Sequence, residues 1–290
     1  MKYLLLLVLV LSGSFVIAQN PSCCASAEEK KNCENKAVMA FANFAGEEDF
    51  RNMHPDPKPL KGLEEKGAMI TYMTRDDQEA QAYMVNGAEG GDRYLFVIHE
   101  WWGLNDHIKA EADRFHEELG GEIHIIALDL YNGNVATTRE EASALMQGVD
   151  PEHARANIQG LIEMIGQEAK VATIGWCFGG GWSLQTTLEL GNQAAGCVIY
   201  YGMPEEDVDR LVGLEADVLG IFASKDKWIN EEVVTTFDQN MKTAGKNLRY
   251  EIFDAHHAFA NPSRDIYNEE AATVANEMTI DFLEKKLGIK

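Results

Sequence analysis

The residues best suited to chemistry lie in the segment Gly-Trp-Cys-Phe-Gly-Gly at positions 175–180. The apolar run at 171–174 predicts a buried strand before it, and residues 178–191 predict a helix after it. A strand, a Gly-x-nucleophile-x-Gly turn and a helix form a nucleophile elbow, here with Cys177 where serine is usual. The flanking glycines remove Cβ atoms that would clash in so sharp a turn, and the helix N-terminus favours a thiolate and then an oxyanion. The same pattern also fits a buried cysteine in a glycine-rich turn of another α/β fold.

Two further residues complete a candidate triad in the chain order nucleophile, acid, histidine. Asp226 follows an apolar segment at 218–223, so we expect it at the C-terminal end of a strand, where catalytic groups collect in open parallel sheets. An alternating segment at 248–253 leads into a loop that contains His256 and His257. One of these histidines can accept the thiol proton while Asp226 holds its tautomer. Taken singly, Asp226 also fits a turn or N-cap and a loop histidine fits a solvated position, but their shared order favours a triad.

With these motifs in place, the sequence resembles the dienelactone hydrolase family over roughly residues 68–288. The resemblance does not cover the first sixty or so residues. The matching pieces are His-Glu-Trp-Trp-Gly-Leu-Asn at 99–105, the elbow at 175–180, Lys-Asp at 225–226 and His-Ala-Phe-Ala at 257–260. The resemblance implies an α/β-hydrolase that cleaves small esters or lactones by acyl transfer and needs no cofactor.

The resemblance also implies roles for individual residues. It gives the base role to His257 and leaves His256 as a neighbour. It implies that Glu100 lies beside the thiol and that the N–H groups of Phe178 and Trp101 form the oxyanion hole. A carboxylate beside a thiol disfavours the thiolate, so Glu100 would keep the cysteine protonated until substrate displaces it. The alternative is that Glu100 is a structural acid that bonds to loop backbone.

The chain departs from the family pattern where the substrate carboxylate would bind. Two arginines hold that carboxylate in the family, one shortly after an Asp-Leu-Tyr segment and one shortly after the catalytic histidine. Gly133 and Asn261 stand near these places here. Arginine suits a carboxylate because its fork binds both oxygens, so we expect neutral esters or lactones to be preferred. Arg264 is close enough in the chain to compensate in principle.

A small-molecule ester or lactone is therefore the expected partner. Several aromatic side chains are candidates for lining its pocket, although some also fit the core: Trp101, Trp102, Tyr131, Trp176, Phe178 and Trp228. Of these we assign substrate contacts to Trp102, Tyr131 and Trp228. No zinc-type spacing or His-Glu-x-x-His motif occurs, and two adjacent loop histidines rarely chelate together, so we assign no metal. The alternative function is that of a non-catalytic binding or thiol-redox protein that retains the hydrolase fold.

Residues 1–18 have the features of a signal peptide. Lys2 supplies a positive start, residues 4–11 are apolar, and residues 16–18 end in a small-residue cleavage site. The apolar stretch is shorter than the ~20 residues of a membrane helix, so we expect no stable anchor. Cys23 lacks the preceding pattern of a lipoprotein signal. We therefore expect export to the periplasm or the extracellular space.

The five cysteines divide into two groups. Cys33 lies close to Cys23 and Cys24, and in an oxidising compartment a local disulfide from Cys33 to either is plausible. Cys197 lies in a buried-strand pattern and is expected to pack as a small hydrophobe.

The remaining sequence predicts one α/β domain at 68–290 after an N-terminal extension or linker at 19–67. The extension should hold a short helix near 35–45 and a proline-containing run, and it either packs on the domain or tethers it. An antiparallel pair near 68–74 and 81–85 should enter the sheet. The later strands are expected near 94–99, 123–128, 171–175, 196–201, 217–223 and 248–253. The helices are expected near 105–119, 138–147, 151–168, 178–191, 230–243 and 264–286. Such alternation is typical of a mostly parallel sheet covered by helices on both faces.

Composition agrees with a globular enzyme. The chain has 290 residues, of which 46% are hydrophobic, which is ample for a core of this size. Its formal net charge of −22 would repel nucleic acid phosphates, so we expect no nucleic-acid partner. A monomer is compatible with the sequence, which does not determine the oligomeric state.

Overall fold

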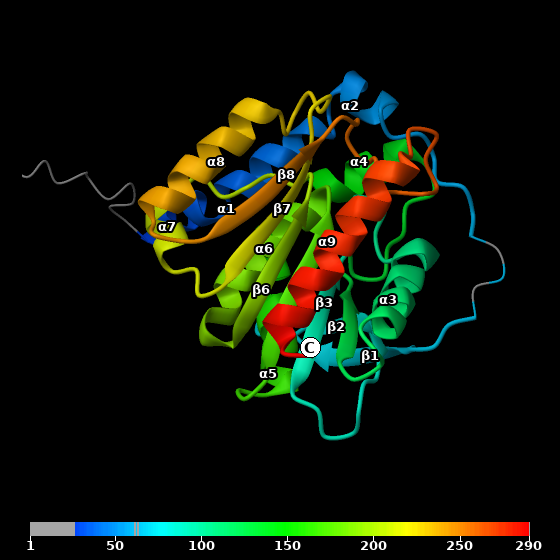
Figure 1. Cartoon of the computed structure of the whole chain (residues 1–290), viewed down its shortest axis with the longest axis vertical. Helices are drawn as coiled ribbons and strands as arrows, with labels where there is room; N and C mark the ends of the chain where they lie inside the picture. The colour runs from blue at the N-terminus through cyan, green and yellow to red at the C-terminus, as the bar shows by residue number, and fades with distance from the viewer. Residues whose placement is uncertain (1–26, 61, 63, 290) are drawn as a thin grey trace, which may run out of the picture.

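Eight strands form one mixed sheet in the order β1-β2-β4-β3-β5-β6-β7-β8 (Figure 1). The structure is a computed structural model and describes residues 27–60, 62 and 64–289. The strands are β1 (Ala68–Met73), β2 (Glu79–Val85), β3 (Arg93–Ile98), β4 (His124–Leu128), β5 (Lys170–Trp176), β6 (Ala194–Tyr200), β7 (Asp217–Ala223) and β8 (Leu248–Phe253). The helices are α1 (Ala27–Phe44), α2 (Glu48–Asn52), α3 (Asp106–Glu118), α4 (Arg139–Gln147), α5 (Pro151–Ile165), α6 (Phe178–Leu190), α7 (Val208–Val212), α8 (Glu231–Thr243) and α9 (Glu269–Leu287), with a 3₁₀ turn at Gly191–Gln193.

The strand directions confirm the predicted α/β-hydrolase sheet. Strands β1 and β2 are antiparallel to each other, and β2 is antiparallel to β4. The remaining neighbours in the sheet are all parallel: β4 with β3, β3 with β5, β5 with β6, β6 with β7, and β7 with β8. Because the carboxyl ends of parallel strands meet at one edge, the loops after β3, β5, β7 and β8 come together there. Those loops carry the four candidate catalytic residues.

Helices cover both faces of the sheet, as Figure 1 shows with α9 on the near side and α1 behind. Helix α3 packs on β2, β3 and β4, and α9 packs on β5, β6 and β7. Helix α9 begins at Glu269, later than the expected 264, because the Asn268 side chain accepts the Ala271 N–H and caps the helix there. The chain before it, from 261 to 268, runs in turns next to the site.

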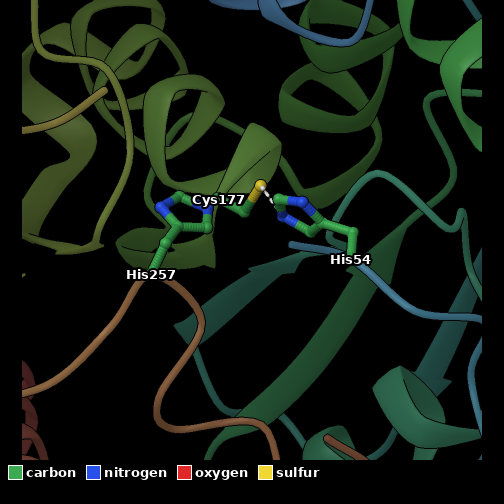
Figure 2. A group of neighbouring side chains, drawn as sticks. All are labelled: His54, Cys177 and His257. Carbon is green, nitrogen blue, oxygen red and sulfur yellow. Dashed lines mark hydrogen bonds between the residues drawn. The ribbon is translucent and has the colours of Figure 1, made fainter. Parts of the chain in front are cut away.

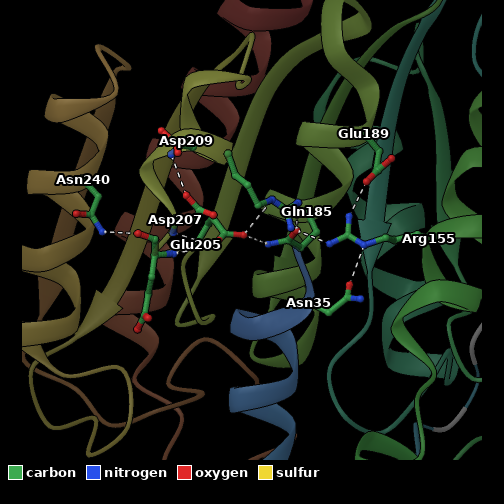
Figure 3. Close-up of polar contacts among 10 residues, drawn as sticks. Asn35, Arg155, Gln185, Glu189, Glu205, Asp207, Asp209 and Asn240 are labelled. Atoms are coloured by element: carbon green, nitrogen blue, oxygen red, sulfur yellow. Dashed lines mark hydrogen bonds and ion pairs between the residues drawn. The ribbon is translucent and has the colours of Figure 1, made fainter. Parts of the chain in front are cut away.

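The N-terminal helices pack on the domain, which the sequence left open. Helix α1 contacts α4, α5 and α6, and α2 contacts α4. Phe41 of α1 and Phe50 of α2 bury their side chains in the core. Asn35 of α1 joins a polar network by accepting a hydrogen bond from Arg155 Nε at 2.9 Å, and Arg155 also donates to Gln185 of α6 at 3.0 Å (Figure 3). These contacts fix the segment that precedes the sheet.

The expected signal peptide and the possible disulfides lie outside the described residues. Residues 1–26 are not described, and neither is the side chain of Cys33. Cys177 and Cys197 are free and buried thiols. Among the helices that the structure describes, none has both the length and the apolar character that crossing a membrane requires.

Candidate active site

Cys177 occupies the sharp turn between β5 and α6. Its backbone has φ 55° and ψ −116°, and its side chain is buried. The glycines around it are required sterically. A Cβ added at Gly175 would lie 2.0 Å from the Gly179 carbonyl oxygen, and one added at Gly179 would lie 2.3 Å from the Ile98 carbonyl oxygen. The chain therefore has the strand, strained residue and helix that the elbow motif predicts.

Asp226 and His257 form a buried pair beside this turn. The Asp226 Oδ2 atom lies 2.6 Å from His257 Nδ1. Its Oδ1 atom accepts the backbone N–H groups of Trp228 at 2.9 Å and Ile229 at 3.0 Å. The carboxylate is thus fixed by the loop after β7 and in turn orients the ring of His257, which leaves Nε2 free to face the sulfur. Among the described residues, Nε2 of His257 has no hydrogen-bond partner.

Burial and neighbouring charges act against each other on these groups. Burial opposes the charged imidazolium, but Asp226 and the Cys177 sulfur together raise the pKa of His257 to about 10. Burial raises the pKa of the Cys177 thiol, Glu100 adds to that rise, and His257 opposes it. Burial also works against the Asp226 carboxylate, yet His257 and the two backbone N–H groups hold its pKa below the usual value. The Asp226 carboxylate therefore stabilises the imidazolium that forms when His257 takes the proton of the Cys177 thiol.

Glu100 lies two residues after the end of β3 and is buried, as expected for a strand end in the cleft. Its Oε2 atom accepts a hydrogen bond from Asn261 Nδ2 at 2.6 Å, whereas its Oε1 atom has no partner within the described part of the chain. Burial raises the pKa of Glu100, and Arg264 and Asn261 counteract that effect. Asn261, which stands near a family arginine position, thus binds the carboxylate of the protein itself.

The two predicted oxyanion-hole residues flank the same space. Phe178 is the first residue of α6, and its backbone N–H interacts with the Cys177 sulfur and lowers the thiol pKa. Trp101 follows Glu100, and its ring is fully buried against Trp102, with ring centroids 5.0 Å apart. Their roles in catalysis remain predictions.

A second imidazole, which the sequence analysis missed, lies against the thiol. His54 Nε2 is 3.9 Å from Cys177 Sγ (Figure 2). His54 Nδ1 lies 2.7 Å from the Phe50 carbonyl oxygen. The His54 ring is 4.6 Å from the Trp101 ring and 5.2 Å from the His257 ring, centroid to centroid. A single histidine in a proline-containing run has no spacing relationship to the elbow, so only packing reveals its position.

Arg264 is a second residue whose place the sequence did not settle. It is buried, and its Nη2 atom donates a hydrogen bond to the Met53 carbonyl oxygen. Its Nε and Nη1 atoms have no hydrogen-bond partner among the residues described. The positive charge of Arg264 opposes the rise in the Glu100 pKa, so the guanidinium and the carboxylate interact in this buried region.

The three residues assigned to substrate contact occupy different positions. Trp102 lines a cavity of about 150 Å³ together with Glu100, Tyr201 and Asn261. Tyr131 packs against Phe178 with ring centroids 5.3 Å apart. Trp228 packs against Phe50 at 5.0 Å and donates its indole N–H to Glu47 at 3.1 Å. Trp102 alone of the three borders this cavity, whereas Tyr131 and Trp228 pack around the catalytic group.

Comparisons with known proteins agree with this architecture. The model of the dienelactone hydrolase family matches residues 81–287. The chain is 27% identical to protein Usf of Aquifex pyrophilus over 76% of its own length and 99% of that protein. It is 27% identical to carboxymethylenebutenolidase 1 of Cupriavidus pinatubonensis over 74% of its length and 95% of that protein.

Two solved structures share the fold. A dienelactone hydrolase-like promiscuous phosphotriesterase from metagenomic libraries superposes with a TM-score of 0.65 at 21% identity, covering 77% of this chain and all of that one. A dienelactone hydrolase from Anabaena variabilis superposes with a TM-score of 0.56 at 15% identity, covering 77% of this chain and 99% of that one. Given the family match over most of its length, this chain belongs to the dienelactone hydrolase family.

Proposed function

We propose that this protein hydrolyses small esters or lactones through an acyl-enzyme intermediate on Cys177. The observation that carries the proposal is the buried group in which Cys177, at φ 55° on the elbow, has its sulfur within 4.8 Å of a ring nitrogen of His257, which is paired with Asp226. A nucleophile, a base and a residue that orients the base are the parts that acyl transfer needs. The family membership and the name of the Cupriavidus relative support a lactone or ester as the substrate.

The mechanism begins with the thiol proton. His257 accepts this proton at Nε2 while Asp226 stabilises the imidazolium, and the sulfur attacks the carbonyl carbon. The Phe178 and Trp101 N–H groups would hold the resulting oxyanion, an interaction that is stronger in the transition state than in the bound substrate. The tetrahedral intermediate then expels the alkoxide, which takes the proton from His257. Water, deprotonated by His257, then attacks the thioester carbonyl. The second tetrahedral intermediate breaks its C–S bond, so the acid is released and the Cys177 sulfur takes the proton back from His257.

Glu100 would set the resting state of the nucleophile. Its negative charge raises the pKa of Cys177, so the free enzyme keeps the thiol protonated. A bound substrate that moves the carboxylate away would remove this effect. The thiolate would then form only when a carbonyl is present to be attacked.

The decisive experiment compares two buried cysteines. Cys177→Ala should abolish turnover of p-nitrophenyl acetate, and the matched variant Cys197→Ala should retain it, since Cys197 lies within β6. Intact-protein mass spectrometry of the wild type, quenched during turnover, should detect one acetyl group that Cys177→Ala lacks. Turnover by a folded Cys177→Ala variant would refute the proposal. Stoichiometric thiol modification without turnover would instead support a thiol-redox protein.

Export is part of the proposed biology. Residues 1–18 motivate it, with Lys2 before an apolar stretch and a small residue at position 18. N-terminal sequencing of the protein isolated from its native cells should begin at Gln19. A mature protein that still starts at Met1 would contradict the proposal.

A further inference from the structure

Three potential metal ligands converge at the candidate active site from three distant parts of the chain (Figure 2). His54 lies just after α2, Cys177 lies before α6, and His257 lies after β8. One ligand atom from each lies within 4.8 Å of the other two, and all three side chains are buried. Catalysis by a triad requires only Cys177 and His257 of this group, so His54 calls for a separate explanation.

Each imidazole is held in the form that binds a metal. A carbonyl oxygen can only accept, so His54 Nδ1 must donate to Phe50 across the 2.7 Å contact, which leaves a lone pair on Nε2. His257 Nδ1 is bound to Asp226 at 2.6 Å, which leaves its Nε2 for the sulfur side. Metal-binding histidines nearly always use their other ring nitrogen in this way, with a backbone carbonyl or a carboxylate as partner.

The thiol alone does not satisfy both imidazoles. Two Nε2 lone pairs face one S–H group, and a single proton can bond to only one of them. Among the described residues, His257 Nε2 has no hydrogen-bond partner although it is buried. A cation that accepts electron pairs from both nitrogens and from the sulfur would satisfy all three atoms at once.

The distances suit zinc. Zinc–sulfur bonds of about 2.3 Å and zinc–nitrogen bonds of about 2.0–2.1 Å place the ligands of a tetrahedral site about 3.3–3.6 Å apart. The observed separation between His54 Nε2 and Cys177 Sγ is 3.9 Å. Closing this pair around a metal needs a shift of a few tenths of an ångström, and the other two separations, which are at most 4.8 Å, need to shorten by no more than about 1.4 Å. Thiolate and imidazole are also the ligands that zinc prefers.

We propose that His54, Cys177 and His257 form a three-ligand site for a zinc-class divalent cation, and that the bound cation switches the hydrolase off. Binding replaces the S–H proton, which is released to solvent, and the fourth position is left for water or a substrate oxygen. The sulfur lone pair that would attack a carbonyl is then shared with the metal, and His257 Nε2 can no longer accept a proton. The inhibitory half of the proposal rests on the proposed hydrolase function; the binding half does not.

His54 is what makes the site more than a catalytic dyad. Two ligands hold a divalent cation weakly, whereas a third ligand already fixed by Phe50 and packed on Trp101 adds affinity without a large ordering cost. The His54 and Phe50 rings are 4.3 Å apart, and the His54 and Trp101 rings are 4.6 Å apart. Because His54 comes from the segment before the sheet, the cation would also link that segment to the loops that carry Cys177 and His257.

The binding test uses Co²⁺ as a spectroscopic probe for zinc, with the full-length mature protein. The wild type should bind one Co²⁺ with a thiolate-to-cobalt charge-transfer band, and Zn²⁺ should displace it. Cys177→Ala should lose the band, which excludes cysteines elsewhere in the chain as its source. His54→Ala should weaken binding at least 10- to 100-fold, the range seen even when groups that only orient a ligand are lost. The exposed neighbour His256 gives the control, and His256→Ala should bind like the wild type.

Folding of each variant is checked by circular dichroism, and His54→Gln replaces His54→Ala if the latter does not fold. Equal cobalt affinity in the wild type and the His54 variant would overturn the site, as would a band that survives in Cys177→Ala.

The inhibition test compares ester turnover with and without Zn²⁺, and with a chelator added afterwards. Zinc should inhibit the wild type reversibly and at far lower concentration than it inhibits the His54 variant. Cobalt binding without turnover in any sample would refute the hydrolase while leaving the metal site standing, and zinc binding without inhibition would refute the switch.

Discussion

The Nε2 atom of His54 lies 3.9 Å from the Sγ atom of Cys177, although 123 positions separate the two residues in the chain. The family match begins only at residue 81, so His54 belongs to a segment that the match does not cover. This segment nevertheless supplies one wall of the candidate active site. The part of this segment that the structure describes therefore packs into the hydrolase domain, and this packing should contribute to both stability and function.

Loss of the Phe50 side chain should destabilise the fold. Phe50 is fully buried and packs against Phe41 with ring centroids 5.9 Å apart and against Trp228 at 5.0 Å. Replacing a buried phenylalanine by alanine costs about 3–5 kcal/mol. Urea unfolding of Phe50→Ala should show a loss of this order, whereas Met39→Ala, at a side chain 52% exposed, should change little. Equal stability of the two variants would mean that the segment does not fold with the domain.

His257, and not its neighbour, should be the general base. His257 is buried and bonded to Asp226, whereas His256 is exposed. General-base catalysis typically contributes 10²–10⁴-fold. Steady-state assays should therefore show a loss of about 10²–10⁴-fold in kcat for His257→Ala and a far smaller loss for His256→Ala. A larger loss for His256→Ala than for His257→Ala would show that His257 is not the general base.

Neutral substrates should be preferred over carboxylates. Glu100 lines the cavity beside Trp102, and the Asn261 amide is already bound to Glu100 at 2.6 Å. A substrate carboxylate in this cavity therefore meets the Glu100 carboxylate, and no arginine is among the described residues that line the cavity. One charge-assisted hydrogen bond contributes about 1.5–3 kcal/mol, so a carboxylated lactone should have a kcat/KM at least about 10-fold below that of its methyl ester. Preference for the free acid would contradict this prediction and implicate the unpartnered atoms of Arg264.

Acid should weaken the fold through His99. The His99 Nδ1 atom donates to the Glu100 carbonyl at 2.6 Å, and His99 Nε2 accepts the Leu130 N–H at 3.1 Å, so only the neutral ring satisfies both bonds. Burial lowers the pKa of His99, although Asp129 opposes this. The unfolded chain, with a histidine pKa near 6.5, thus binds the proton more readily than the folded chain. The stability that His99 contributes is present above pH about 6.5 and is lost as the pH falls toward its lower folded-state pKa.

Urea unfolding between pH 7.5 and pH 5 tests whether stability falls with acid in this way. The unfolding free energy of the wild type should fall more steeply with acid than that of His99→Gln, which has no imidazole to protonate. The control His256→Gln should keep the wild-type slope, because that histidine is exposed. If the unfolding free energies of the wild type and His99→Gln change in parallel with pH, protonation of His99 does not cause the loss of stability in acid.

Local sequence determined much of the fold. The apolar runs before residues 100, 177 and 226 predict strands that the structure contains as β3, β5 and β7. The glycines at 175 and 179 predict the elbow, since any Cβ there would meet backbone atoms. Chain order then predicts that Cys177, Asp226 and His257 meet, because parallel strands bring their carboxyl ends to one edge. These conclusions rest on short-range patterns and on one rule of sheet topology.

Tertiary packing alone decided what else surrounds the sulfur. His54 reaches Cys177 because Phe50 and Phe41 bury their rings in the core and carry the following loop over the site. The Arg264 hydrogen bond to the Met53 carbonyl joins that loop to the segment after β8. Periodicity and motif spacing describe neighbours along the chain, whereas these contacts depend on how two distant surfaces fit together. The sequence therefore determined the likeness to a hydrolase, and packing determined that a second imidazole faces its candidate nucleophile.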